Sequence, residues 1–251
     1  MGNKKTINTL FYSFLFIQIL AALFNIFQYG TNIGSYFFLT RDWSENSSLL
    51  LERIWGLSSL VFLALSFWKR FFLIPISLFF FSLSFSSYLQ GGFFGSEFVV
   101  WAHLARIVFP LFGVSENLKV KKGILLIGVA STFIFHGIEA MKGNPEFLDL
   151  FIYFYSFIFN SFPEEDISTQ IIYWVGVSDI AVGVLALFLR KNIVLMAYLA
   201  FWGFFTALLR PLFYGVDGIA PFFERVPHFL VPILIICLIK YCNIKSNRSF
   251  L

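Results

Sequence analysis

The sequence contains few charged residues and almost no cysteine. Charged side chains make up 13% of the 251 residues and hydrophobic side chains 59%, whereas soluble domains contain about 25% charged and about 45–50% apolar residues. The two cysteines, Cys237 and Cys242, match neither a disulfide framework nor a metal-ligand pattern. This composition excludes an ordinary soluble domain and indicates a chain that folds in a lipid bilayer.

Motifs for hydrolytic chemistry are also missing. The sequence has no G-x-S-x-G nucleophile elbow, no glycine-rich Walker loop and no H-E-x-x-H pair, so neither ATP-driven transport nor serine hydrolysis is expected. The 18 basic residues occur in short clusters between apolar runs, which is typical of membrane topology signals rather than of a nucleic-acid surface. The lipid bilayer is therefore the expected partner, and no nucleic acid is expected.

Eight stretches are apolar and long enough for membrane-spanning helices, which require about 20 residues. They are residues 9–28, 49–68, 71–90, 98–115, 123–141, 169–189, 193–213 and 226–242. The segment 146–161 is also apolar, but it is short and flanked by Pro145 and Pro163, so it is predicted to form an interfacial or re-entrant helix. The expected fold class is an all-α integral membrane protein with about eight transmembrane helices.

The charge distribution orients these spans. With the N-terminus inside, most Lys and Arg residues fall in cytoplasmic loops, and Glu116 is the only acid in those loops. Eight spans place both termini in the cytoplasm. A ninth span at 146–161 is disfavoured because it would move Arg190 and Lys191 to the outer side.

The two halves of the chain are similar at an offset of about 120 residues. Trp55–Arg70 aligns with Trp174–Lys191, and both segments end in a basic pair. Glu97–Phe112 aligns with Pro221–Ile236, and each has a His near its start and a Pro deeper in. This similarity predicts two parallel four-helix repeats, residues 1–118 and 119–251.

Ionisable residues inside the spans are the candidates for function, because a charge in hydrocarbon costs about 2.5–3.5 kcal/mol on insertion scales. Six of the seven candidates fall toward the outer side. The seven are His103, Arg106, His136, Glu139, Asp179, Arg210 and His228. Asp179 lies near the middle of its span, in the small-residue run GVSDIAVG, and is predicted to be the most buried acid in a region of close helix contact.

Together these residues predict a polar pocket that opens outward, and several chemistries remain open for it. Two His residues on different spans could clamp a haem, or a His and an acid could bind a quinone and relay its protons. Arg106 and Arg210 could instead grip an anionic group. No metal is assigned, because the doubled Glu-x-x-His motif of di-iron bundles is missing.

A purely structural role is the alternative to a pocket. In that case Arg106 or Arg210 pairs with Asp179 or Glu139 and only fixes helix register. Four further charged residues near span ends are expected to extend into the headgroup region. They are Glu52, Arg53, Glu224 and Arg225.

The second half of the chain resembles the DoxX-like membrane proteins over about 120 residues. The likeness is carried by His136-Gly137, by Pro145-Glu146-Phe147 and by the small-residue run Gly176–Gly183 with its acid Asp179. The first half is similar only through the repeat, and the additional spans depart from the four-span family pattern. The resemblance implies a bacterial cytoplasmic membrane location and a link to quinone-associated sulfur or redox chemistry.

Three functional hypotheses follow, and no catalytic residue is assigned in any of them. The first is a redox-linked accessory protein that binds a quinone or haem, with His103, His136 and His228 as ligands or proton relays and with Asp179 and Glu139 balancing the two arginines. The second is a proton-coupled transporter of a small molecule or lipid. The third is a structural subunit of a larger membrane complex.

Overall fold

The computed structural model describes residues 4–92 and 94–248, and these residues form helices and connecting turns without any strand. Six helical stretches are long and apolar enough to cross a membrane. They are Lys5–Gln28, Glu45–Ser66, Arg70–Gln90, Leu118–Met141, Glu165–Phe188 and Ile193–Cys242. The chain is therefore an all-helical, multi-pass membrane protein, as the composition predicts.

The helices follow one another with short connections. The first half contains α1 (Lys4–Gln28), α2 (Asn32–Arg41), α3 (Glu45–Ser66), η1 (Arg70–Phe72), α4 (Leu73–Gln90), α5 (Val99–Ala102), α6 (Leu104–Val108) and α7 (Leu111–Val114). The second half contains α8 (Leu118–Met141), α9 (Pro145–Phe159), α10 (Glu165–Phe188), α11 (Ile193–Tyr214), η2 (Gly215–Gly218), α12 (Ile219–Glu224) and α13 (Val226–Arg248).

One of the eight expected spans is not a continuous helix. Residues 98–115 form α5, α6 and α7, because the backbone leaves helical geometry at His103 and because Pro110, which has no amide hydrogen, follows the end of α6. The last apolar stretch, Ile193–Cys242, holds two long helices, α11 and α13, joined by η2 and α12. Length and composition alone thus give six candidate spans.

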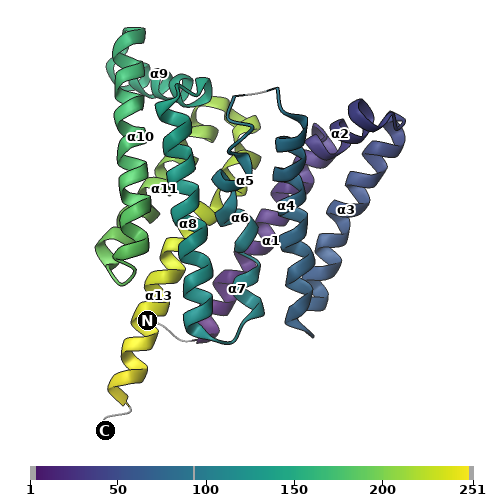
Figure 1. Cartoon of the computed structure of the whole chain (residues 1–251), viewed down its shortest axis with the longest axis vertical. Helices are drawn as coiled ribbons and strands as arrows, with labels where there is room; N and C mark the ends of the chain where they lie inside the picture. Colours follow the sequence, from purple (N-terminus) through teal and green to yellow (C-terminus); the bar gives the residue numbers. More distant parts are fainter. Residues whose placement is uncertain (1–3, 93, 249–251) are drawn as a thin grey trace.

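The long helices run side by side, and α1 begins at the same end of the bundle at which α13 ends (Figure 1). At the opposite end, α2 and α9 lie crosswise to the long helices (Figure 1). The expected short helix at 146–161 is present as α9, which begins at Pro145 and is capped by the Asn144 side chain. We call this end of the bundle the α9 end.

Helix α10 packs against α8 through glycines. A Cβ at Gly137 would lie 2.6 Å from the carbonyl oxygen of Gly176, and a Cβ at Gly176 would lie 2.5 Å from the carbonyl oxygen of Gly137. Gly183 makes a similar approach to Ala130. Since only hydrogen fits at these positions, the predicted close helix contact around Asp179 is confirmed.

Glu52 is buried, which corrects the expectation that its side chain extends into the headgroup region. Its carboxylate is 0% exposed and accepts hydrogen bonds from the Thr31 amide, the Thr31 hydroxyl and the Gly34 amide at the start of α2. A carboxylate is stabilised there because the first amide groups of a helix have no partner within the helix. Glu52 is also less exposed than Asp179, so the prediction that Asp179 is the most buried acid is wrong.

Candidate functional site

Six of the seven predicted site residues line two neighbouring cavities. The first, which we call the α9 cavity, has a volume of about 300 Å³ and is lined by His136, Asp179, Arg210 and His228. The second, the α2 cavity, has a volume of about 480 Å³ and is lined by His103 and Arg106. Glu139 lines neither cavity but contacts His136. The single pocket expected from the sequence is thus divided in two.

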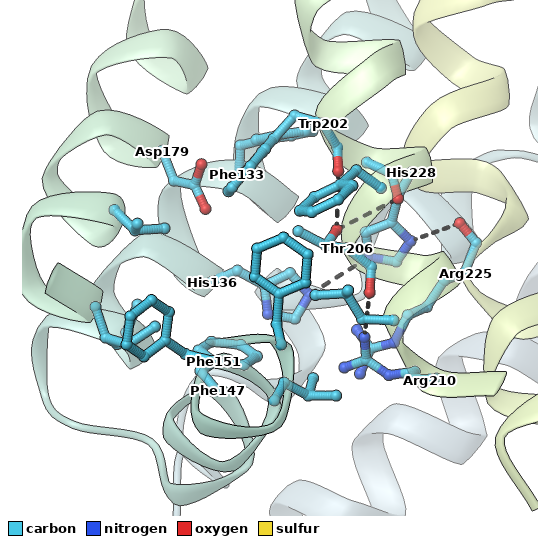
Figure 2. A pocket seen from close by; sticks show the side chains of 18 of the residues that line it. Phe133, His136, Phe147, Phe151, Asp179, Trp202, Thr206, Arg210, Arg225 and His228 are labelled. Atoms are coloured by element: carbon cyan, nitrogen blue, oxygen red, sulfur yellow. Dashed lines mark hydrogen bonds between the residues drawn. The ribbon is translucent and has the colours of Figure 1, made fainter. Parts of the chain in front are cut away.

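The α9 cavity is mainly apolar and is covered by α9. One face of α9 covers the cavity with apolar side chains at helical spacing, namely Phe147, Leu150, Phe151 and Phe154. Figure 2 shows Phe147 and Phe151 below the cavity and Phe133 above it. An apolar cavity with a few polar groups is the usual form of a small-molecule site.

Two histidines and a glutamate form a connected chain at the cavity wall. Nε2 of His136 lies 3.4 Å from Nε2 of His228, and Nδ1 of His136 lies 2.9 Å from a carboxylate oxygen of Glu139. Nδ1 of His228 lies 3.0 Å from the carbonyl oxygen of Arg225 (Figure 2). The spacing His-x-x-Glu on α8 brings His136 and Glu139 together, as the sequence predicts.

Asp179 and Trp202 present polar atoms to the same cavity from α10 and α11 (Figure 2). The Trp202 indole lies close enough to the Asp179 carboxylate to interact with it, but the two groups do not reach hydrogen-bond geometry. The Asp179 oxygen Oδ1 and the Trp202 nitrogen Nε1 are buried and have no hydrogen-bond partner among residues 4–92 and 94–248. Buried polar groups are rarely left unpaired, because each one costs about 1–3 kcal/mol. These two atoms are therefore available to a bound molecule.

The cationic side of the cavity is made by two arginines and one carboxylate. Nη2 of Arg210 lies 2.6 Å from Oε1 of Glu146, and Nη2 of Arg225 lies 3.4 Å from the same oxygen. Burial alone would raise the pKa of Glu146, but the positive charges of Arg225 and Arg210 outweigh it and lower the pKa below the ordinary value. Glu146 is therefore ionised at neutral pH and anchors the first turn of α9.

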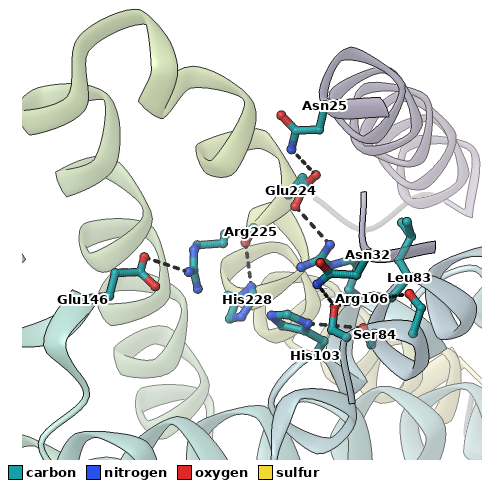
Figure 3. Close-up of polar contacts among 12 residues, drawn as sticks. Asn25, Asn32, Leu83, Ser84, His103, Arg106, Glu146, Glu224, Arg225 and His228 are labelled. Carbon is teal, nitrogen blue, oxygen red and sulfur yellow. Dashed lines mark hydrogen bonds and ion pairs between the residues drawn. The ribbon is translucent and has the colours of Figure 1, made fainter. Parts of the chain in front are cut away.

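Arg106 is held by Glu224 at the boundary of the α2 cavity. Its Nη1 lies 3.0 Å from Oε2 of Glu224, whose other oxygen accepts a hydrogen bond of 2.6 Å from the Asn25 amide (Figure 3). Nδ1 of His103 lies 3.2 Å from the hydroxyl oxygen of Ser84. His103 therefore contributes to the wall of the α2 cavity and not to that of the α9 cavity.

These pairings correct the expected ion pairs. Arg106 and Arg210 were expected to pair with Asp179 or Glu139, but their partners are Glu224 and Glu146. Among the described residues Asp179 forms no ion pair, since α10 presents it to the cavity rather than to a cation.

Glu224 and Arg225 were expected to extend into the headgroup region, and both instead bind charged partners within the protein. The sequence placed Glu146 in an outer segment without a partner. Its position in the first turn after Pro145, at the same predicted level as Arg210, was the available signal. Nothing in the sequence distinguishes the indole of Trp202 from those of the other tryptophans.

The site geometry discriminates between the expected ligands. Within residues 4–92 and 94–248, no three His, Cys, Asp or Glu side chains are grouped so that they could hold a metal ion. The rings of His136 and His228 are hydrogen-bonded to each other, and their ring centroids lie 5.5 Å apart. A porphyrin therefore does not fit between these two rings, so they cannot be a pair of axial haem ligands in this arrangement.

Comparisons of this chain with models of protein families, with curated proteins and with solved structures give no match.

Proposed function

We propose that this chain is a multi-pass protein of the bacterial cytoplasmic membrane that binds one quinone-like lipophilic molecule in the α9 cavity. In this proposal the chain crosses the membrane eight times as two four-helix halves, and both termini are cytoplasmic. The broken segment α5–α7 and the two helices of the last apolar stretch supply the crossings beyond the other five. The α9 end then faces outward, with α9 at the membrane interface.

One observation carries the proposal: an apolar cavity presents unsatisfied polar atoms on one side and charged and imidazole groups on the other. Oδ1 of Asp179 can accept a hydrogen bond and Nε1 of Trp202 can donate one, and neither atom forms a hydrogen bond within the described part of the chain. Figure 2 places these two side chains on the far side of the cavity from Arg210 and Arg225. A ring with oxygen atoms on opposite edges would satisfy both sides.

The resemblance to DoxX-like membrane proteins supports the same assignment. His136, Pro145-Glu146-Phe147 and Asp179, which carry the likeness, all belong to the walls of the α9 cavity or adjoin them. The family's association with quinones is therefore relevant to the part of the chain that forms this cavity.

The proposal is tested by purifying the protein in mild detergent and identifying co-extracted molecules by mass spectrometry. The wild type is compared with Trp202→Phe and Asp179→Asn, which alter the unpartnered atoms, and with His103→Asn as the matched control in the other cavity. We expect a quinone with the wild type and the control, reduced at least several-fold in the two cavity variants. A wild type that carries no quinone and does not bind added short-chain ubiquinone overturns the proposal.

Proton-coupled transport is the second candidate, and Asp179 favours it because a buried carboxylate without an ion pair is a common proton-binding group in transporters. Uptake of a radiolabelled quinone analogue into vesicles would then depend on a pH gradient. It would be abolished by Asp179→Asn, whereas simple binding gives no gradient-dependent uptake.

A further inference from the structure

The chain of contacts from Glu139 through His136 to His228 requires a specific number of hydrogens. The contacts are Glu139 Oε2 to His136 Nδ1, His136 Nε2 to His228 Nε2, and His228 Nδ1 to the carbonyl oxygen of Arg225. A carbonyl oxygen only accepts, so His228 Nδ1 must carry hydrogen. Each of the other two contacts also needs one hydrogen between its two atoms. The three contacts together therefore need three hydrogens.

Two neutral imidazoles and an ionised carboxylate supply only two. In that state either the two Nε2 lone pairs face each other, or the lone pair of His136 Nδ1 faces the carboxylate. Both arrangements are repulsive, and the negative charge of Glu139 remains uncompensated in a side chain that is 6% exposed. One additional proton completes all three hydrogen bonds and makes the group neutral overall.

We propose that Glu139, His136 and His228 together form a binding site for one exchangeable proton, which we call the proton triad. In the loaded state His136 is an imidazolium that donates from Nδ1 to Glu139 and from Nε2 to His228. His228 is neutral, with its hydrogen on Nδ1. The proton is shared among three side chains of α8 and α13 and belongs to no single one of them.

The triad connects the α9 cavity with the α9 end of the bundle. His136 and His228 line the cavity. Glu139 lies in the last turns of α8, where Gly95 covers its carboxylate so closely that a Cβ would come within 2.7 Å of Oε1. The Glu97–Lys142 ion pair lies nearby on the exposed surface. A proton that enters at Glu139 reaches the cavity wall at His136 through one hydrogen bond and reaches His228 through a second.

His103 is not part of the triad. Its ring centroid lies 6.2 Å from that of His136, and its Nδ1 contacts Ser84. Several charged or titratable groups face the triad from the elements packed around it. They are His103 and Arg106 from α5–α6, Arg225 after α12, Arg210 from α11 with Glu146 from α9, and Asp179 from α10 across the cavity.

The proton triad does not require a ligand, but its role in exchanging a proton with a bound molecule rests on the proposed function. If a quinone-like molecule occupies the α9 cavity, the triad is the group in the cavity wall that can exchange a proton with it. The two proposals are tested separately, because the protonation of the triad can be measured in protein without added ligand.

Nitrogen-15 NMR of the full chain, labelled at histidine and reconstituted in lipid nanodiscs, tests the triad. The chain has only 3 His residues, and single His→Asn variants assign the signals. We expect one imidazolium, assigned to His136, and one neutral His228 with hydrogen on Nδ1, which is the less common tautomer of free histidine. The two rings should never both be imidazolium, because the three contacts have room for only one proton beyond those of two neutral rings.

Glu139→Gln supplies the decisive variant, with Glu97→Gln as the control on the exposed surface. Removing the charge of Glu139 should abolish the imidazolium signal at neutral pH, and the control should keep it. Two neutral rings in the wild type at neutral pH, or an imidazolium that survives Glu139→Gln in a protein with wild-type thermal stability, overturns the triad. A result in which the triad is present and no quinone binds would overturn only the proposed function.

Discussion

Arg210 and Glu146 connect α11 to α9, the helix that covers the α9 cavity, with 2.6 Å between Nη2 of the arginine and Oε1 of the glutamate. The Arg210 side chain is 3% exposed and the Glu146 side chain is 45% exposed. The pair therefore lies at the edge of the cavity, where solvent reaches one partner only. Movement of α9 away from α11 requires this contact to break.

Replacing Glu146 with Gln should loosen α9. The change leaves the buried charge of Arg210 without its anion, and we expect a loss on the order of 1–3 kcal/mol, less than for a fully buried pair because water reaches Glu146. Amide hydrogen exchange should accelerate in α9 and remain unchanged in α3. Glu165→Gln, at the exposed start of α10, is the control, and equal exchange in the two variants would contradict a role for the Arg210–Glu146 pair in holding α9.

The same contact predicts a dependence of α9 on pH. Burial would raise the pKa of Glu146, but Arg225 and Arg210 lower it below its usual 4.5. A carboxyl group with a lowered pKa in the folded state contributes stability above its unfolded pKa and loses it as the pH falls through the folded value. Exchange in α9 should thus be slow at neutral pH and increase only at pH values below 4.5. Glu146→Gln should lack this acid transition.

Gly176→Val should destabilise the bundle. Its side chain would collide with the backbone carbonyl of Gly137, which cannot move without separating α8 from α10. Overpacking of this kind costs about 1–3 kcal/mol. Gly123→Val is the matched control, since Gly123 lies in α8 and a Cβ added there would meet no neighbouring atom within 4 Å. Thermal unfolding in detergent should show a lower midpoint for the first variant only.

Glu52→Gln should unfold α2 without disrupting the remainder of the bundle. The carboxylate accepts three hydrogen bonds at the start of that helix, and bonds to a charged group contribute about 1.5–3 kcal/mol each. Hydrogen exchange in 32–41 reports the change. Glu45→Gln, at the exposed first turn of α3, should leave α2 protected, and a similar loss in both variants would rule out a capping role.

Asp179→Asn should raise the stability of the protein and lower its binding of quinone. The wild-type carboxylate has a buried oxygen without a partner, so removing its charge should stabilise the ligand-free protein by on the order of 1 kcal/mol. Quinone retention should fall at the same time. Asp166→Asn, in the exposed first turn of α10, should leave retention unchanged. A variant that loses both stability and ligand would instead identify Asp179 as a structural residue.

Much of the fold follows from the sequence because hydropathy and charge clusters act locally. The long apolar runs predict helices such as α1, α3 and α10, and the prolines around 146–161 predict a separate short helix. The break at His103 was harder to predict, because nothing in the apolar run marks it, whereas Pro110 is a sequence signal that interrupts the expected span 98–115.

The site was predicted only in part, for a related reason. Helical spacing links His136 with Glu139, which is a contact within one helix. The partners of Arg106 and Arg210 come from segments 118 and 64 residues away in sequence. A single sequence can place such residues at a similar level in the membrane but does not pair them. The division into two cavities depends on how those segments pack.

The Gly137–Gly176 contact also determines which parts of the molecule can move. Because their backbones are in direct contact, α8 and α10 form a rigid helix pair that holds His136 and Asp179 at a fixed separation. Any route by which a bulky molecule reaches the cavity must therefore lead past the other walls. The contact between α9 and α11, where Glu146 meets Arg210, is one of those walls, and separating the two helices there would open the cavity at the α9 end.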